Sequence, residues 1–328
     1  MTNAHKNKKL LIILQYIAII ITFVCLIVNP KLNMTSFYEG ISLWAKFVLP
    51  ALFPILFFAS LLNSSNVTRN IGNFLSPVTK KLFNCSGVSG YIYILSILSG
   101  YPVGAKATSE IYEKGIITQK EACRITAFAS TSGPLFILGT VGVGMFGSMR
   151  LGVVVLISHL LGALINGIIF RNLYKKKNIS NFTLPKTTKS ANILEDCMLS
   201  SIKSILLIGG YIALSYMLIT IVNSYNLLLP ITTSLNQIFG LDINTSNAIL
   251  NGLFEITKGI KELSILGLNE NICAIISTGI ISMGGISIFL QAYTYLAKFQ
   301  IKIRLYLLEK ILHTAISCAI CSILVIIF

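Results

Sequence analysis

The chain has 328 residues, of which 54% are hydrophobic and only 11% are charged, with 26 Lys and Arg against 11 Asp and Glu. Soluble proteins carry about a quarter charged residues, so this composition excludes a soluble domain, a disordered chain and a disulfide-rich secreted module. The net charge of +15 lies in short basic stretches between apolar runs, a pattern typical of membrane topology rather than of nucleic-acid binding. We therefore expect an all-α polytopic membrane protein.

Seven apolar runs approach or exceed the length needed to cross a bilayer as a helix, which is about 20 residues. They lie at residues 10–28, 41–62, 122–146, 151–170, 202–222, 272–296 and 311–328. The first follows three lysines and precedes no cleavage site, so we expect an uncleaved anchor helix rather than a signal peptide. The polar, basic residues 63–89 predict one or two interfacial helices.

Two further apolar runs, residues 91–98 and 248–254, are too short to cross as helices. The first is followed by Ser99-Gly-Tyr-Pro-Val-Gly-Ala-Lys106 and the second by Glu255-Ile-Thr-Lys-Gly-Ile-Lys261. We interpret both as re-entrant helical hairpins, which leave the membrane on the side that they entered. Two of the longer runs are also interrupted, by Ser130-Thr-Ser-Gly-Pro134 and by Ser282-Met-Gly-Gly285.

The order of these features repeats along the chain. Each half contains a long run, a short apolar piece, a hairpin and an interrupted run, and the Gly-x-Lys at Gly104 corresponds to that at Gly259. Placing the N-terminus in the cytoplasm leaves 21 of the 26 basic residues in cytoplasmic segments. The two halves then run in opposite directions, as inverted-topology repeats of secondary transporters do.

These patterns divide the chain into five segments. We expect an N-terminal anchor helix and loop (1–40), a first repeat with its hairpin and linking span (41–170) and a basic cytoplasmic loop (171–200). A second, inverted repeat (201–310) and a C-terminal span (311–328) complete the prediction.

Helix interruptions at membrane depth leave backbone N–H and C=O groups that need a partner, so we expect the four breaks to meet around a polar solute. The predicted substrate-binding residues of the first half are Ser99, Gly100, Tyr101, Pro102, Gly104, Lys106, Ser130, Thr131, Ser132 and Gly133. Those of the second half are Glu255, Thr257, Lys258, Gly259, Ser282, Gly284 and Gly285. For any single small residue, close helix packing is the alternative interpretation.

Ionisable groups next to the breaks are functional candidates because charge is costly in a membrane. Glu255 could carry a coupling proton or pair with Lys106 of the opposing hairpin, and the lysines could attract an anionic solute. Alternatively, Lys258 and Lys261 reach interfacial water through their long stems. His159 and His313 have no neighbour at ligand spacing in the sequence, so we expect no metal site.

Two catalytic patterns are set aside. Gly142-Val-Gly144-Met-Phe-Gly147 has the spacing of a dinucleotide-binding loop, but it lacks a preceding strand and a following acid. It predicts close helix packing instead. A Ser–Lys pair such as Ser99 with Lys106 has no identifiable third group to orient it. We therefore expect no enzyme and no cofactor, with intramembrane hydrolysis as the third-ranked alternative.

The motif Ser99-Gly-Tyr-Pro-Val-Gly-Ala-Lys106, followed by Phe128-Ala-Ser-Thr-Ser-Gly-Pro134 and Phe136-Ile-Leu-Gly-Thr-Val-Gly142, resembles the nucleoside-recognition (Gate) domain family. The similarity is strongest to its sporulation members and covers roughly residues 42–310. It implies an inner-membrane protein related in architecture to concentrative nucleoside transporters. It also implies a role in spore cortex formation and in moving dipicolinate across a forespore membrane.

Together these features predict a transporter that moves a small polar, anionic solute by alternating access, with one half rocking against the other. The expected partners are the lipid bilayer, the solute and a coupling ion, H⁺ or Na⁺, and no nucleic acid. The expected location is the cell membrane, with several spans and a cytoplasmic N-terminus. The alternatives are a non-transporting scaffold needed for spore formation and a nucleoside transporter.

Overall fold

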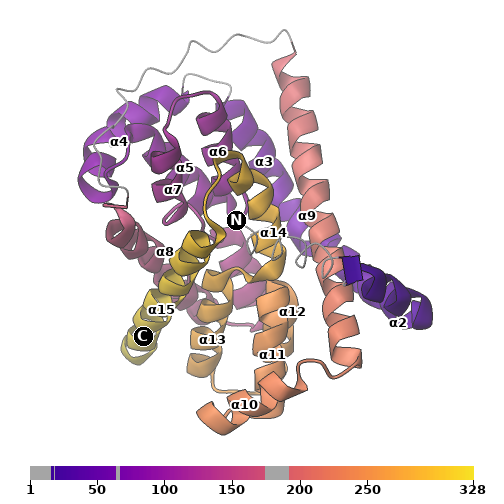
Figure 1. Ribbon diagram of the computed structural model, residues 1–328. Coiled ribbons are helices and arrows are strands. Elements are labelled where there is room, and N and C mark those ends of the chain that lie inside the picture. The colour runs from indigo at the N-terminus through magenta and orange to yellow at the C-terminus, as the bar shows by residue number, and fades with distance from the viewer. Residues whose placement is uncertain (1–15, 18, 64–66, 174–191) are drawn as a thin grey trace, which may run out of the picture.

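A computed structural model describes residues 16–17, 19–63, 67–173 and 192–328 (Figure 1). Every regular element within these ranges is helical, which confirms the predicted all-α class. Residues 1–15, with the start of the predicted anchor run, and residues 174–191, with most of the predicted basic loop, lie outside the described part.

The described helices form two sets along the chain, one before and one after residues 174–191. The first set is α2 (Pro30–Leu43), the π-helix η1 (Trp44–Val48), α3 (Leu49–Asn63), α4 (Val67–Phe83), α5 (Gly87–Ser99), α6 (Val103–Glu113), α7 (Gln119–Thr126), the π-helix η2 (Leu135–Met145) and α8 (Met149–Phe170). The second set is α9 (Ile193–Ser224), α10 (Leu229–Phe239), α11 (Ile243–Phe254), α12 (Ile256–Ser264), α13 (Glu270–Met283), α14 (Gly285–Leu296), the 3₁₀-helix η3 (Ala297–Phe299) and α15 (Ile303–Ile327).

Four helical segments of the described chain are long and apolar enough to cross a membrane. They are Met149–Phe170, Ile193–Ser224, Glu270–Phe299 and Ile303–Ile327. Two bent pairs raise the number to as many as six: Ile19–Val28 with Pro30–Val48, at 106°, and Asn70–Phe83 with Gly87–Ser99, at 92°. The chain is thus a multi-pass membrane protein.

Several predicted boundaries were wrong. The run at 41–62 is the later part of a longer helical segment that begins at Pro30 and passes through η1 to the end of α3 at Asn63. The last span begins at Ile303 rather than at 311. The segment 63–89 forms one helix, α4, before α5 begins, and its placement at the membrane interface stays a prediction.

All four predicted interruptions are present. Residues 100–102 separate α5 from α6, and residues 127–134 separate α7 from η2. Glu255 alone separates α11 from α12, with an extended backbone (φ −144°, ψ 115°). Between α13 and α14 the chain turns at Gly284 (φ 88°) and Gly285 (φ 63°), a left-handed conformation that costs residues with a side chain about 1–2 kcal/mol each.

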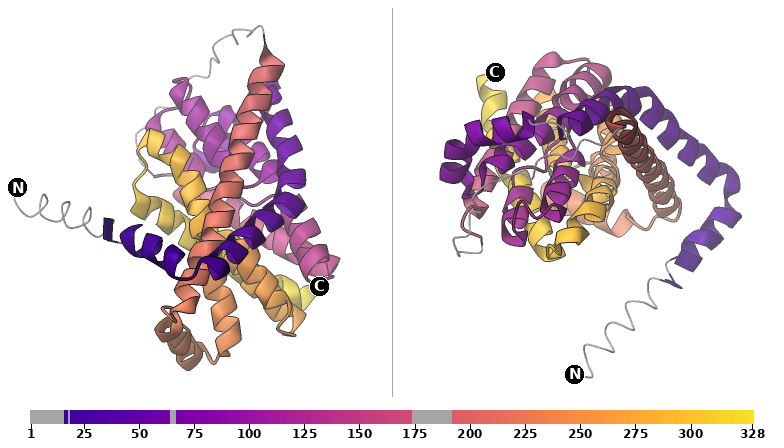
Figure 2. Two further views of the ribbon diagram at one scale, coloured as in Figure 1. Left: turned by 90° about the vertical axis from the view of Figure 1, so that its right-hand side faces the viewer. Right: turned by 90° about the horizontal axis from the view of Figure 1, so that it is seen from above.

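The two hairpins lie towards opposite ends of the molecule. In Figure 1, α4, α5 and α6 occupy the upper half, whereas α10, α11 and α13 occupy the lower half, and α9 runs along the side from top to bottom. Figure 2 shows α2 crossing α9, with the preceding helix extending away from the body. Gly40 permits this crossing, because a Cβ there would lie 2.7 Å from Cα of Ala213.

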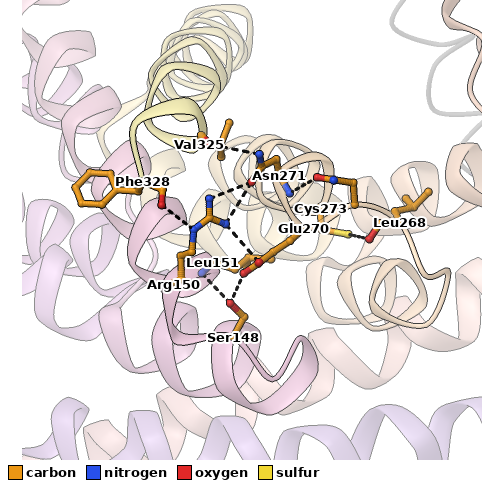
Figure 3. Close-up of polar contacts among 10 residues, drawn as sticks. Ser148, Arg150, Leu151, Leu268, Glu270, Asn271, Cys273, Val325 and Phe328 are labelled. Atoms are coloured by element: carbon orange, nitrogen blue, oxygen red, sulfur yellow. Dashed lines mark hydrogen bonds and ion pairs between the residues drawn. The ribbon is translucent and has the colours of Figure 1, made fainter.

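A polar cluster joins the ends of α8, α13 and α15 (Figure 3). Arg150 forms an ion pair with Glu270 at 3.3 Å, and both guanidinium amino groups of Arg150 donate to the amide oxygen of Asn271 at 3.2 Å. The Asn271 amide donates in turn to the carbonyl of Val325 at 3.3 Å. Because the charged pair is about 40% exposed, it contributes at most about 1 kcal/mol and serves to align three helix ends.

Candidate functional site

Three of the four interruptions line one pocket, with about 600 Å³ of space free of protein atoms that includes open solvent. Seven of the predicted binding residues line it: Ser99, Gly100, Tyr101, Ser132, Gly133, Glu255 and Thr257. They come from both hairpin tips and from the break between α7 and η2. Gln291 of α14, which the sequence did not single out, completes the polar lining.

The rest of the wall is apolar. Phe47, Val48 and Leu52 come from η1 and α3, Ile208 and Ile212 from α9, and Phe136, Ile256 and Ile288 from the helices next to the breaks. The pocket therefore lies between the hairpin tips and a hydrophobic cluster formed mainly by α2, η1, α3 and α9, which Val103 at the start of α6 also joins. A few polar groups on apolar walls are typical of sites that bind a small amphipathic molecule.

Glu255 forms the tip of the second hairpin and also caps α12. Its Oε2 accepts hydrogen bonds from the N–H of Lys258 at 2.9 Å and from the hydroxyl of Thr257. This is the N-cap arrangement that satisfies free N–H groups at the start of a helix. The carboxylate is buried, with 4% exposure.

His159 of α8 joins two breaks. Its Nε2 accepts a hydrogen bond from the N–H of Ser132 at 2.8 Å, so its Nδ1 carries the proton and donates to Oγ of Ser282 at 2.8 Å. The backbone N–H of Ser132, which has no helical partner in the break between α7 and η2, thereby gains a hydrogen bond. His159 has no neighbour at ligand spacing in the sequence, but the fold brings the ring of His313 on α15 to within 4.8 Å of it.

Lys310 lies behind the pocket wall. The predicted topology had counted it among the basic residues of the cytoplasmic segments. Its Nζ donates to Oη of Tyr101 at 2.6 Å and to the carbonyl of Ser130 at 3.3 Å. It lies 4.7 Å from the centre of the Tyr101 ring. The earlier start of α15 explains the difference, because it carries residue 310 well into a spanning helix.

The predicted lysines do not face the pocket. Lys106 donates to the hydroxyls of Ser200 (2.8 Å) and Ser204 (2.9 Å) on α9, so the predicted pairing with Glu255 was wrong. Lys258 forms an ion pair with Glu262 at 3.8 Å and lies 5.1 Å from the centre of the Tyr216 ring.

The remaining predicted residues support the pocket without lining it. Gly104 and Gly259 pack the hairpins closely, because a Cβ would strike Ala129 in the first case and Gly252 in the second. Thr131 bonds Ser96 at 2.9 Å, and Ser130 bonds Tyr306 at 3.1 Å. The others are Pro102, on the wall of a smaller cavity, Ser282, which bonds His159, and Gly284 and Gly285 in their break.

A second cavity, with an empty volume of about 840 Å³, lies between α9, α10, α11 and α12. Its polar lining consists of Asn223, Asn226, Asn244, Asn247, Asn251 and Glu262. Asn223 donates to Asn251 at 3.0 Å, and Asn251 donates to Glu262 at 2.6 Å. Because Glu262 pairs with Lys258, a continuous polar chain leads from this cavity to the helix that Glu255 caps.

Comparisons with known proteins agree with the motif resemblance. Residues 45–149 match the family described as nucleoside recognition (Gate), which contains the first hairpin and its neighbouring break. The chain is 29% identical over 309 residues to the sporulation integral membrane protein YlbJ of Bacillus subtilis (strain 168), covering 87% of this chain and 76% of that protein. No solved structure matches. The chain is thus a multi-pass membrane protein with a region that matches the nucleoside-recognition (Gate) family, and it is similar over most of its length to a sporulation integral membrane protein.

Proposed function

We propose that this chain is a membrane transporter that carries a small polar solute through the pocket by alternating access. The observation that carries the proposal is that both hairpin tips and the break before η2 line one pocket. Interrupted helices that meet inside a membrane protein are typical of substrate sites in secondary transporters. A scaffold, the competing function, requires no such pocket, and the pocket therefore favours transport.

The lining favours a neutral solute with a flat apolar part and several hydrogen-bonding groups. Glu255 is the charged residue among the described lining residues, and a carboxylate disfavours an anion. The anionic solute predicted from the sequence depended on Lys106 and Lys258, which make their contacts elsewhere. A nucleoside satisfies the requirement, whereas dipicolinate does not.

The placement of the two hairpins supports alternating access. The hairpins lie in opposite halves of Figure 1 and their tips share the pocket, so each hairpin can gate one side. The pocket lies between the tips and the α2–α3–α9 cluster. We propose that the motion changes the contact between these two parts, with the N-terminus in the cytoplasm, as the distribution of basic residues favours. The asparagine-lined cavity is then the route by which the solute reaches the pocket from the side of the membrane on which α10 lies.

Similarity to a sporulation membrane protein suggests that the transport serves spore formation. The alternative, a scaffold for spore formation that moves no solute, makes a different prediction for the purified protein. It predicts no uptake beyond that of empty vesicles.

Uptake by proteoliposomes tests the proposal. Radiolabelled uridine and dipicolinate are compared as solutes, with Ile212→Trp as the variant that fills the pocket and Leu214→Trp as the matched control. Leu214 lies on the same helix, but it is 47% exposed and does not line the pocket. We expect uridine uptake by the wild type, a decrease of about tenfold or more in Ile212→Trp, equivalent to about 1.4 kcal/mol, and no change in Leu214→Trp.

The outcomes separate the alternatives. Absence of uptake of either solute by the wild type would support the scaffold. Uptake of dipicolinate in preference to uridine would contradict the neutral solute and restore the anionic one. Equal uptake by the two tryptophan variants would show that the solute does not pass through this pocket.

A further inference from the structure

Lys310 is a buried amine that the proposed transport cycle has not yet used. It is 4% exposed, and its Nζ donates to Tyr101 at the first hairpin tip and to Ser130 in the neighbouring break. A Cβ on Gly284, in the break between α13 and α14, would lie 3.8 Å from the same Nζ. The amine therefore lies where three of the four interruptions meet.

No carboxylate of the described residues lies within ion-pair distance of this amine. The neighbouring Glu309 turns towards Thr126, whose hydroxyl donates to its Oε2 at 2.9 Å, and its Oε1 is buried without a hydrogen bond. Removing a charge from water costs several kcal/mol unless a partner compensates it, and an ionisable residue within a membrane is a functional candidate for this reason. Such a group is suited to gaining and losing a proton during a cycle.

The other titratable groups near Lys310 are Tyr101, Tyr306, His159 and His313. Both ring nitrogens of His159 are occupied, by Ser132 and Ser282. His313 Nε2 is 3.0 Å from the carbonyl of His159, which can only accept, so this nitrogen donates. Tyr306 bonds Ser130. Tyr101 is thus the titratable neighbour that both contacts Lys310 and lines the pocket.

Tyr101 links the amine to the solute site. Its hydroxyl oxygen accepts the hydrogen bond of Lys310, and its own proton points towards the carbonyl of Ile281, at a long 3.4 Å. When Lys310 is protonated, Tyr101 can donate only away from the amine. When Lys310 is neutral, the hydroxyl can donate to the amine and present its oxygen to the pocket. The protonation of Lys310 therefore sets which hydrogen bond Tyr101 offers to a solute.

We propose that Lys310 is the proton-carrying group of the transporter and that H⁺ is the coupling ion. This inference rests on the proposed function. Because linkage is reciprocal, a solute that prefers one orientation of the Tyr101 hydroxyl changes the proton occupancy of Lys310 by the same free energy. The ammonium of Lys310 releases its proton to water in the pocket when the pocket opens to one side, and the amine takes up a proton when it opens to the other. No covalent bond changes.

A purely structural role is the competing explanation, because the Lys310 ammonium also satisfies the carbonyl of Ser130. Two substitutions separate the roles. Lys310→Arg retains the charge and the donors but does not release its proton, since guanidinium stays protonated in proteins. Lys310→Met retains the chain length and carries no proton. A structural role is preserved in the arginine variant, whereas a proton-carrying role is lost in both.

The experiment compares two transport modes in proteoliposomes, with uridine as the probe, or dipicolinate if the wild type prefers it. Net accumulation is measured under a gradient of one pH unit, with Na⁺ absent from or present on both sides. Counterflow, in which unlabelled solute inside exchanges for labelled solute outside, needs no net proton movement. Lys298→Met is the matched control, because Lys298 is an exposed partner of Glu113.

We expect the wild type and Lys298→Met to accumulate solute about tenfold per pH unit, equivalent to about 1.4 kcal/mol for one proton, with or without Na⁺. Both Lys310 variants should retain counterflow and lose accumulation. Accumulation by Lys310→Arg at the wild-type level, or dependence on Na⁺ instead of on the pH gradient, would overturn the inference while leaving the proposed function intact. Absence of counterflow in the wild type would overturn both.

A readout without solute covers the case in which neither variant transports. The difference in Tm between the wild type and Lys310→Met is measured in detergent from about pH 5 to pH 9. The same difference is measured between the wild type and Lys298→Met. If the Tm difference for Lys310→Met changes more with pH than the one for Lys298→Met, Lys310 titrates in the folded protein. A difference that stays constant across this range would show that Lys310 carries no exchangeable proton there and would overturn the inference.

Discussion

His159 donates a hydrogen bond to Ser282 across a distance of 2.8 Å and so connects α8 with the end of α13. The same imidazole accepts the N–H of Ser132, which belongs to the break in the other half of the chain. One side chain therefore holds the two interrupted helices in register. The ring serves as a connector, because neither nitrogen is left to bind a solute.

Replacing this connector should loosen both breaks. In His159→Leu the buried N–H of Ser132 loses its partner, which costs about 1–3 kcal/mol. We expect a lower Tm in detergent and weaker solute binding. Ser158→Ala is the matched control, because Ser158 is equally buried on the same helix and donates to the carbonyl of Val154 in its own turn rather than to a helix break. An unchanged Tm in His159→Leu would show that water or a neighbouring group replaces the imidazole.

Glu255 and Asp242 cap the two helices of one hairpin, but only Glu255 lines the pocket. In Glu255→Gln the capping oxygen remains while the charge is lost. A hydrogen bond to a charged acceptor exceeds one to a neutral acceptor by about 1 kcal/mol, so we expect uridine affinity to fall about fivefold. Isothermal titration calorimetry in detergent measures the change.

Asp242→Asn is the matched control for that measurement. Hydrogen bonds from the hydroxyl and N–H of Thr245 hold the pKa of the exposed Asp242 below its usual value. Its contribution to stability is therefore complete above the unfolded-state pKa of about 3.9 and is lost as the pH falls through the lower folded-state pKa. At neutral pH we expect unchanged uridine affinity in Asp242→Asn. Equal losses in both variants would assign the effect to hairpin stability rather than to solute contact.

Glycine packing inside the second hairpin gives a third prediction. A Cβ on Gly259 would strike the backbone of Gly252, which cannot move aside without separating α11 from α12. Gly259→Ala should therefore lower stability by about 1–3 kcal/mol. Gly210→Ala, in α9, meets nothing within 4 Å and should raise stability by about 0.5–1 kcal/mol, since alanine favours a helix. The Tm of each variant is measured against that of the wild type, and a change in the same direction for both variants would contradict this prediction.

The orientation in the membrane can be tested by labelling. Ser234 on α10 and Lys120 on α7 are both exposed, and the inverted topology predicted from the sequence would place them on opposite sides of the membrane. In intact cells, a membrane-impermeant maleimide should label Ser234→Cys and should label Lys120→Cys only after permeabilisation. The wild type is the control for its own cysteines, of which Cys25 and Cys318 are partly exposed. Labelling of both positions in intact cells would exclude opposed halves.

Local composition was enough to predict the helix breaks and the membrane class. Gly284 and Gly285, the two short apolar runs and the acid at 255 all mark places where a membrane helix cannot continue, and each break is present. In the glycine-rich run at 142–147, Gly142 packs closely against Gly152, as expected, whereas Gly147 has nothing within 4 Å of an added Cβ and adopts a positive φ of 64°. The motif around Ser99 identified the family resemblance that the comparisons support.

Contacts between distant helices could not be predicted in the same way. His159 and Ser282 are separated by 123 positions, and Lys310 and Tyr101 by 209. Nothing local to Lys310 distinguishes it from a lysine at a membrane boundary, because its burial depends on where α15 begins. The apolar pocket wall from α3 and α9 was missed for a similar reason, since an apolar residue facing a solute has the same sequence pattern as one facing lipid.

The adjacent glycines between α13 and α14 restrict how this sequence can diverge. Each has a positive φ, so any substitution by a residue with a side chain carries a backbone penalty of about 1–2 kcal/mol in addition to the carbonyl oxygens that crowd Gly285. Homologues that keep this turn must therefore keep the doublet. A homologue that has the glycine doublet can form the same break between α13 and α14. In a homologue that lacks it, we expect a straighter penultimate span.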